Sequence, residues 1–298
     1  MADPEVLALR ELLAQRPRPT DIGERRVGFD AFAKAFPVAA DIVVEPAEAN
    51  SVPAEWTNVP GANEYRAVLY LHGGGYVIGS LDSHRHVASE IARDLDGRTL
   101  ALHYRLAPEH RFPAPVEDAV AGYLFLMEQG YAPGQIAIAG DSAGGGLVVA
   151  TMIALKNAGL PQPVCGWCIS PWVDMEGIGD SMTTKAEEDP IVQKGPLLEM
   201  AGLYLGRAKP REPLAAPIYG DLRGLAPLFI QVGEAETLLD DAVRLADAAK
   251  AADVPVELEI WPEMPHVWHL FHPRLQAGRR AISAGAKFIR TAMDKAAS

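Results

Sequence analysis

Cysteine is scarce in this chain of 298 residues, which holds only Cys165 and Cys168. The two are spaced C-x-x-C in a stretch of strand-like composition. Residues three apart in a strand lie about 10 Å apart and point to opposite faces, whereas a disulfide requires Cα atoms within about 7 Å. We therefore expect two free core thiols rather than a redox or metal site, as suits a reducing cytoplasm.

Basic charge and long apolar runs are also lacking. The chain has 27 Lys and Arg against 39 Asp and Glu, a formal net charge of −12. This deficit argues against nucleic acid or an anionic membrane surface as a partner. The longest apolar stretch, from Ser142 to Leu155, falls short of the roughly 20 residues that span a bilayer. The start has early acidic residues and no signal-peptide core, so we expect a cytoplasmic protein without a membrane span.

Apolar segments of strand character alternate with amphipathic segments from residue 65 onward. Strands are expected within 65–74, 99–105, 135–140, 164–170, 227–233 and 256–262, and helices within 116–130, 143–159, 240–253 and 277–296. Such alternation predicts an α/β fold with a mostly parallel, doubly wound sheet and helices on both faces. No linker divides the chain, so 1–298 is expected to be one domain.

Two regions fall outside this rhythm. Residues 5–16 and 29–36 have the spacing of short amphipathic helices, with Phe29, Phe32 and Phe36 on one side. Residues 174–213 hold two helical pieces where one crossover would suffice. Long insertions in compact α/β domains are usually lids or binding elements.

The strongest chemical signal is G-x-S-x-G at residues 140–144, between a strand and an apolar helix. In such a turn a Cβ at Gly140 or Gly144 would clash with nearby backbone. The turn presents the Ser142 hydroxyl at a helix N-terminus, where developing negative charge is favoured. The motif in this context predicts a serine nucleophile.

A second signal is His72-Gly73-Gly74-Gly75 at the end of a buried strand. Its backbone N–H groups suit an oxyanion hole, which needs preorganised donors about 3 Å from the developing charge. We predict the N–H groups of Gly74, Gly75 and Ala143 as these donors. His72 is expected to bond loop backbone rather than to react.

The base and its acid should follow the serine in chain order. After Ser142 the only histidines are His266, His269 and His272, and His266 lies closest to a strand end, so we predict it as the base. Their spacing also suggests a metal cluster, but no matching Cys or carboxylate set lies nearby. No metal or cofactor is expected.

Four carboxylates compete for the role of the acid after the strand 227–233: Glu234, Glu236, Asp240 and Asp241. Asp240 or Asp241 has the character of a helix N-cap, and Glu234 is expected in the turn. Glu236 remains the best candidate to orient His266.

The residues HGGG (72–75), YRLAPE (104–109) and GDSAGG (140–145), followed by a late acid and a histidine, resemble the bacterial hormone-sensitive-lipase-type carboxylesterases of the α/β-hydrolase superfamily. The resemblance covers nearly the whole chain and implies a cap formed by about 1–40 and 174–213. It assigns Ser142 as nucleophile, His266 as base, and Gly74, Gly75 and Ala143 as oxyanion donors. The family pattern D-P-L-x-D reads E-T-L-L-D here, which puts the acid on Glu236 and leaves Asp240 as the alternative.

These parts predict a cofactor-independent serine carboxylesterase working through an acyl-enzyme. By resemblance, its substrates are short- to medium-chain esters and it forms a homodimer. A lactone or amide hydrolase would use the same triad. A non-catalytic small-molecule receptor of similar fold would lack the histidine, so His266 favours an enzyme.

Overall fold

Across residues 3–15 and 19–298, which the computed structural model describes, the strands form one eight-stranded sheet. Its order is β1-β2-β4-β3-β5-β6-β7-β8, so β1 and β8 lie at the edges. The strands are β1 (Val43–Ala49), β2 (Val52–Asn58), β3 (Ala67–Leu71), β4 (Arg98–Leu102), β5 (Ile136–Asp141), β6 (Cys165–Ile169), β7 (Leu228–Gly233) and β8 (Val256–Trp261).

The sheet is mostly parallel, as predicted. Only the pairs β1·β2 and β2·β4 are antiparallel, and the remaining neighbours run parallel. Strands β3, β5, β6 and β7 are buried along their whole length, because a parallel sheet is covered on both faces and tolerates nearly continuous apolar sequence. The carboxyl ends of these strands therefore meet at one edge, where the predicted site residues lie.

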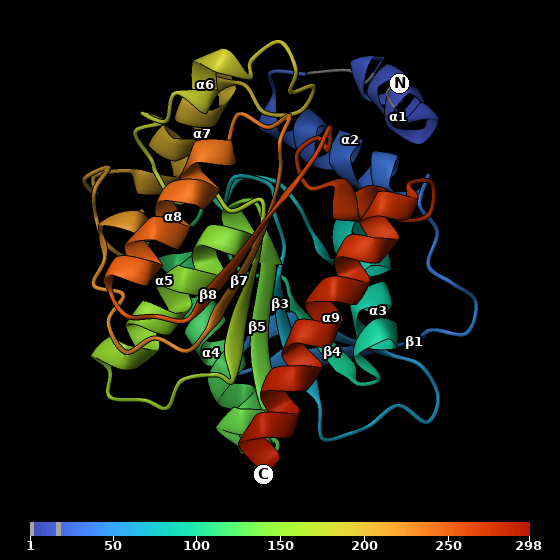
Figure 1. Cartoon of the computed structure of the whole chain (residues 1–298), viewed down its shortest axis with the longest axis vertical. Helices are drawn as coiled ribbons and strands as arrows, with labels where there is room; N and C mark the ends of the chain where they lie inside the picture. The colour runs from blue at the N-terminus through green and yellow to red at the C-terminus, as the bar shows by residue number, and fades with distance from the viewer. Residues whose placement is uncertain (1–2, 16–18) are drawn as a thin grey trace.

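Helices cover both faces of the sheet (Figure 1). Helices α4 (Ala114–Glu128), α5 (Ala143–Asn157) and α8 (Leu239–Ala251) lie on one face, and α3 (Leu81–Leu95) and α9 (Gln276–Ala297) on the other. Cys168 packs in the core on the α5 side and Cys165 in the core on the α9 side. Both are free and buried, which confirms the prediction from strand geometry.

Four further helices gather at one end of the molecule (Figure 1): α1 (Pro4–Ala14), α2 (Ile22–Ala33), α6 (Ser181–Thr184) and α7 (Lys194–Leu205). The helical pieces α6 and α7 lie in the insertion 174–213, as predicted. Short 3₁₀ turns complete the described elements: η1 (Pro133–Gln135), η2 (Pro217–Tyr219) and η3 (Trp268–Phe271). Residues 1–2 and 16–18 of the predicted segments 1–40 and 5–16 lie outside the described residues.

The predicted bounds of the second helix, 29–36, were wrong. The helix begins earlier because the carboxylate of Asp21 accepts a hydrogen bond from the N–H of Glu24 at 2.9 Å and caps the first turn. It ends at Ala33, and Phe36 lies outside it. Phe36 precedes Pro37, and a residue before proline disfavours helical backbone.

Arg26 links helix α2 to the core through hydrogen bonds. The Arg26 guanidinium donates to the carbonyls of Val77 and Ala107, both at 2.9 Å. It also makes two bonds to the Glu109 carboxylate, at 2.9 and 2.8 Å. Glu109 ends the YRLAPE segment and Val77 follows the glycine loop, so this arginine ties α2 to the loop that carries the predicted oxyanion donors.

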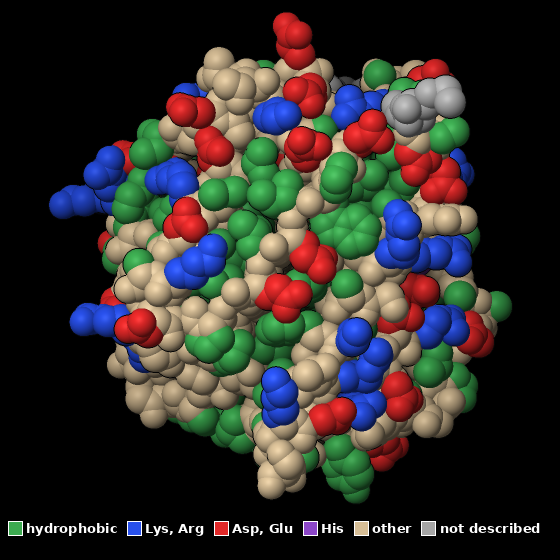
Figure 2. All heavy atoms as spheres, viewed as in Figure 1, with side chains coloured by type: hydrophobic (Ala, Val, Ile, Leu, Met, Phe, Trp, Pro, Cys, Tyr) green, Lys and Arg blue, Asp and Glu red, His purple; other side chains and the backbone are tan. Residues whose placement is uncertain are grey.

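The described part of the chain contains no helix that is both long and apolar enough to cross a membrane. Figure 2 shows basic and acidic side chains interspersed over the face that it presents.

Candidate active site

Ser142 lies in a strained turn between β5 and α5. Its φ of 54° and ψ of −119° are rare for a residue with a side chain. The turn is held by the backbone, since the Ser142 N–H donates to Ile169 at 2.8 Å and its carbonyl accepts from Trp172 at 2.9 Å. Asp141 and Ala143 are buried, whereas Ser142 keeps partial exposure, so the turn presents the hydroxyl outward.

The glycines of this turn are required sterically, as predicted. A Cβ at Gly140 would come within 2.5 Å of the Gly144 carbonyl oxygen, and a Cβ at Gly144 would collide with the carbonyl oxygen of Leu71. Because these obstacles are backbone atoms, neither position accommodates a side chain without moving the strands.

The glycine loop also depends on backbone that only glycine adopts readily. Gly74 has a φ of 116° and Gly75 a φ of 62°. His72 donates from Nδ1 to the Gly73 carbonyl at 2.8 Å, and burial lowers the pKa of His72 to about 3. The predicted structural role of His72 is therefore confirmed: a neutral imidazole bonds the loop.

Asp141 fixes the start of the same loop, a role that the sequence analysis missed. Its carboxylate accepts hydrogen bonds from the Gly73 N–H at 3.0 Å and the Tyr70 hydroxyl at 2.7 Å. Burial raises the pKa of Asp141, but His84, 3.4 Å away, and the hydrogen bonds outweigh burial and lower it overall. The signal in the sequence was an acidic residue ending an otherwise apolar strand.

Glu236 and His266 form a buried pair. The Nδ1 of His266 lies 2.8 Å from Glu236 Oε2, which leaves Nε2 as the other ring nitrogen. The second carboxylate oxygen accepts from the Gly233 N–H at 2.6 Å and from the Ser170 hydroxyl at 2.7 Å. The hydrogen bonds from Gly233 and Ser170 hold the carboxylate in position to bond the imidazole.

The electrostatics of the pair favour a proton on the imidazole. Burial raises the pKa of Glu236. Burial opposes the charged form of His266, but the Glu236 carboxylate outweighs it and raises the pKa of His266 above its ordinary value of 6.5. The pair therefore stabilises an imidazolium more than an isolated buried histidine would.

The prediction that Asp240 or Asp241 caps the following helix was wrong. Leu238 occupies the N-cap of α8, without a side-chain cap. Asp241 instead accepts from the N–H groups of Val173 and Asp174 at 2.9 and 3.0 Å. Asp240 accepts from the Ser181 N–H at 2.8 Å. Both carboxylates are therefore turned away from the helix start, toward backbone N–H groups of the insertion and of the residue directly before it.

The remaining candidate, Glu234, is exposed and lies in the turn that follows β7, as expected. Its N–H donates to the Trp261 carbonyl at 2.9 Å.

Two supporting residues also escaped the sequence analysis. Ser170, at a φ of 44°, donates to Glu236 and accepts from the N–H of Val267 at 3.2 Å, so it bridges the acid loop and the histidine loop. Asp189 accepts from the N–H and the hydroxyl of Thr237, at 2.8 and 3.1 Å. The same carboxylate accepts from the N–H groups of Ile191 and Val192. It therefore joins the insertion to the loop of Glu236.

The three late histidines have separate surroundings. His269 lies with Nε2 2.9 Å from Gln231 Oε1, and the ring of His272 stacks on His86 at 5.7 Å. Among the described residues, no group of three or more His, Cys, Asp or Glu is placed to hold a metal ion.

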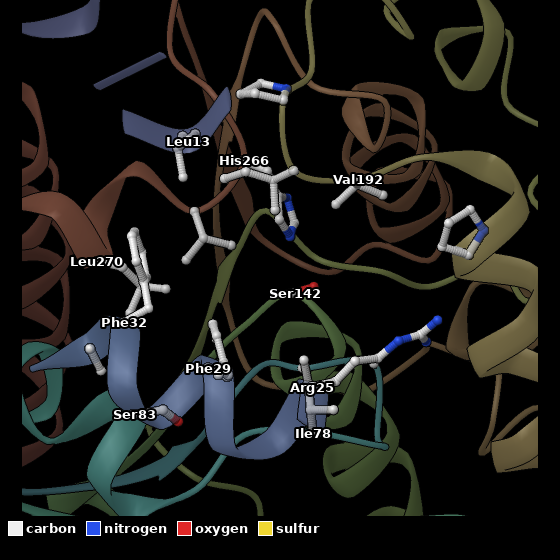
Figure 3. Close-up of a pocket in the computed structure, with 18 of the residues that line it drawn as sticks. Leu13, Arg25, Phe29, Phe32, Ile78, Ser83, Ser142, Val192, His266 and Leu270 are labelled. Atoms are coloured by element: carbon white, nitrogen blue, oxygen red, sulfur yellow. The ribbon is translucent and has the colours of Figure 1, made fainter. Parts of the chain in front are cut away.

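A cavity of about 1400 Å³ opens above the carboxyl ends of the strands. Ser142, His266, Gly74 and Gly75 line it, and Figure 3 shows Ser142 and the His266 ring facing this space. Ala143 and Glu236 are fully buried. Most of the remaining lining is apolar and comes from α1, α2, the segment 190–200 and the residues after His266.

Comparisons with known proteins agree with this architecture. Residues 68–270 match a family model described as the alpha/beta hydrolase fold. An acetyl-hydrolase of Streptomyces hygroscopicus is 47% identical over 297 residues, covering 98% of each chain. A carboxylesterase of Mycobacterium tuberculosis, NlhH, is 31% identical over 91% of this chain and 83% of its own.

Solved structures give the same result. An esterase from the bacterial hormone-sensitive lipase family superposes with a TM-score of 0.96 at 48% identity, covering 98% of this chain and 99% of the other. EstE5, in a crystal soaked with p-nitrophenyl butyrate, superposes with a TM-score of 0.95 at 44% identity, covering 98% of this chain and all of the other. The chain therefore belongs to the bacterial hormone-sensitive-lipase-type esterases, which have the α/β-hydrolase fold.

Proposed function

We propose that this carboxylic ester hydrolase works through Ser142 as nucleophile, His266 as general base and Glu236 as the acid that orients the base. The observation that carries the proposal is the buried bond of 2.8 Å between Glu236 and His266, with His266 and Ser142 lining one cavity. Because Nδ1 donates to the carboxylate, Nε2 is the nitrogen available to the serine.

In the first half of the reaction, the Ser142 hydroxyl attacks the ester carbonyl carbon while His266 Nε2 accepts its proton. The negative charge then develops on the carbonyl oxygen, which the N–H groups of Gly74, Gly75 and Ala143 stabilise. The positive φ values of Gly74 and Gly75 support this assignment. The intermediate collapses, the bond to the alcohol oxygen breaks, and the alcohol leaves with the proton from His266.

In the second half, a water molecule attacks the acyl-enzyme. His266 accepts a proton from that water, and the collapse of the second intermediate returns the proton to Ser142 as the carboxylic acid leaves. The Glu236 carboxylate stabilises the imidazolium in both halves, in keeping with the raised pKa of His266.

The substrates are proposed to be esters with a short to medium acyl chain. A relative named as an acetyl-hydrolase supports a short acyl group. The segments 1–40 and 174–213 are proposed to form the cap, since their described residues line much of the cavity wall.

A panel of p-nitrophenyl esters from acetate upward tests this function. We expect turnover that is highest for the short chains and that is lost in Ser142→Ala. Including simple lactones separates the alternative: hydrolysis of lactones in clear preference to the open esters would assign the enzyme to lactone hydrolysis.

Two further proposals concern the setting of the enzyme. A homodimer is supported by the edge position of β8 and by its apolar residue Ile260, which is 46% exposed. A monomer mass in light scattering at micromolar concentration would remove it. A cytoplasmic location is supported by the two free thiols.

A further inference from the structure

Asp189 is a buried carboxylate of the insertion that bonds two functional parts of the molecule at once. The residue is 2% exposed. One oxygen, Oδ1, accepts from the N–H groups of Ile191 and Val192 at 2.8 and 2.9 Å. The other, Oδ2, accepts from the N–H of Thr237 at 2.8 Å and lies 3.1 Å from its hydroxyl. The two oxygens thus bond donors from two different segments.

The first of these segments belongs to the cavity wall. Ile191 and Val192 line the cavity together with Ser142 and His266. Figure 3 shows Val192 and the His266 ring facing the same space. The two N–H groups that Asp189 binds therefore fix the backbone of a stretch that borders the space for a substrate.

The second segment carries the proposed acid. Thr237 directly follows Glu236, so its N–H belongs to the peptide group that joins these two residues. The bond to Asp189 therefore holds the backbone of Glu236, while Gly233 and Ser170 hold its carboxylate. The Ser181 hydroxyl also donates to this loop, but to the Thr237 carbonyl, at 2.6 Å, one peptide group further from the acid.

Asp189 also adds negative charge near the pair of Glu236 and His266. Burial opposes the protonated form of His266, Glu236 outweighs burial, and Asp189 and Asp141 add to the rise in the pKa of His266. These three carboxylates are the charged groups with the largest effect on the imidazole. Neutralising Asp189 should therefore lower the pKa of His266, an effect for which a loss of packing alone gives no reason.

We propose that Asp189 is a positioning residue of this esterase, which aligns Glu236 with His266 while the insertion is seated against the loop of the acid. The inference rests on the proposed function, in which Glu236 is the acid. Asp189 does not line the cavity, so it acts through the peptide group of Glu236 rather than on the substrate. Because one carboxylate holds both the wall at 191–192 and the loop of Glu236, a displacement of either segment is transmitted to the other.

The test is a double-mutant cycle of Asp189→Asn and Glu236→Gln, measured as kcat on p-nitrophenyl acetate. Asparagine keeps the size of the side chain, but its NH₂ group has to face an N–H donor on one side. In the wild-type background, Asp189→Asn should lower kcat on the order of 10- to 100-fold. In the Glu236→Gln background the same change should cost less than about threefold, because the residue that it positions has already lost its role.

The pH profile gives a second readout. The midpoint of kcat/KM should lie at lower pH in Asp189→Asn than in wild type, because a negative charge that raises the pKa of His266 is lost. Asp174→Asn is the matched control, since Asp174 is a buried carboxylate of the same insertion that bonds Arg244 of α8 at 2.7 Å. This control should lower the thermal stability but leave kcat and the pH midpoint close to those of wild type.

Thr237→Val serves where Asp189→Asn does not fold. It removes the hydroxyl beside Asp189 but keeps the N–H bond, and it should lower kcat by a smaller factor, again in the presence of Glu236 but not in the Glu236→Gln background. An unchanged kcat in Thr237→Val would then overturn the inference.

Equal losses from Asp189→Asn in both backgrounds, a wild-type kcat in the single variant, or an unchanged pH midpoint would overturn the inference and leave the esterase function intact. A fall in Asp174→Asn as large as that in Asp189→Asn would also overturn it, because the effect would then be one of general stability. Failure of the proposed function has a different signature: wild type inactive on p-nitrophenyl acetate, or Ser142→Ala or Glu236→Gln as active as wild type.

Discussion

The cavity has a floor, formed by the turns and loops at the carboxyl ends of the strands, and a roof, formed by α1, α2 and the segment 190–200. The two are built in different ways. On the floor, Ser142 and Gly74 have positive φ angles, and a Cβ added at Gly74 would collide with the backbone carbonyl of Ile78. On the roof, Phe29, Phe32 and Met200 are partly exposed side chains from short helices. In the proposed mechanism the floor holds the reacting groups, whereas the roof lines the space that the substrate would occupy. Mutations on the floor should therefore change kcat, and those on the roof the choice of substrate.

The largest effect is expected from the proposed nucleophile. Ser142→Ala removes the hydroxyl but keeps the backbone bonds of the turn, so kcat should fall on the order of 10⁶-fold. Thermal unfolding should stay close to that of wild type. Rates of p-nitrophenyl acetate hydrolysis check the loss of activity, and a thermal melting curve checks that the fold is kept. Near-normal turnover would refute the assignment of Ser142 as nucleophile.

Glu236, the proposed acid, should give the next largest effect. Glu236→Gln keeps the size of the side chain but removes the charge that stabilises the imidazolium, and kcat should fall about 10⁴-fold. KM should change little, because Glu236 is fully buried and does not line the cavity.

Asp240→Asn is the matched control for this change. Its carboxylate bonds the Ser181 N–H, so losing the charge should cost about 1 kcal/mol of unfolding free energy and leave turnover nearly unchanged. An inactive Asp240→Asn beside an active Glu236→Gln would transfer the role of acid to Asp240.

The glycine loop allows floor and roof to be compared at two adjacent residues, Gly74 and Gly75. A Cβ at Gly74 would collide with the backbone carbonyl of Ile78, whereas one at Gly75 would meet the flexible thioether of Met200. Gly74→Ala should therefore displace the proposed oxyanion donors and lower kcat about 10²- to 10³-fold. Gly75→Ala should cost less, and Met200→Ala added to it should recover part of the loss. Equal losses in both single variants, without recovery, would contradict this distinction.

The pH dependence should show the smallest change. In the proposed mechanism only neutral His266 acts as a base, and its pKa is raised above 6.5. Activity should therefore rise with pH through a midpoint above 6.5. In Glu236→Gln the main cause of the raised pKa is gone while burial, which lowers it, remains. The midpoint of the residual activity should then move to lower pH, as kcat/KM profiles of both proteins will show.

Features with a local cause could be predicted from the sequence. The parallel sheet follows from apolar segments separated by helices, and the turn of Ser142 follows from glycines two residues away on each side. The positions of Glu236 and His266 follow from strand ends that meet at one edge of the sheet. Each of these needs only a short segment and a rule about its neighbours.

Features with a distant cause could not be predicted. Ser170 bonds Glu236 across 66 residues, and Asp189 bonds Thr237 across 48. No spacing in the sequence connects either pair. Asp240 and Asp241 show the same limit. Local preference favoured a helix cap, but Asp240 accepts from the N–H of Ser181 and Asp241 from the N–H groups of Val173 and Asp174.

The two cysteines offer separate probes of the two helical layers. Cys168 is covered from the side of α5 and Cys165 from the side of α9, and burial raises the pKa of both thiols. Neither reacts as a thiolate while its layer is closed. With one of the pair replaced by alanine, alkylation of the other reports how often that single layer opens. The rates would show whether the protein loosens from one face of the sheet or from both together.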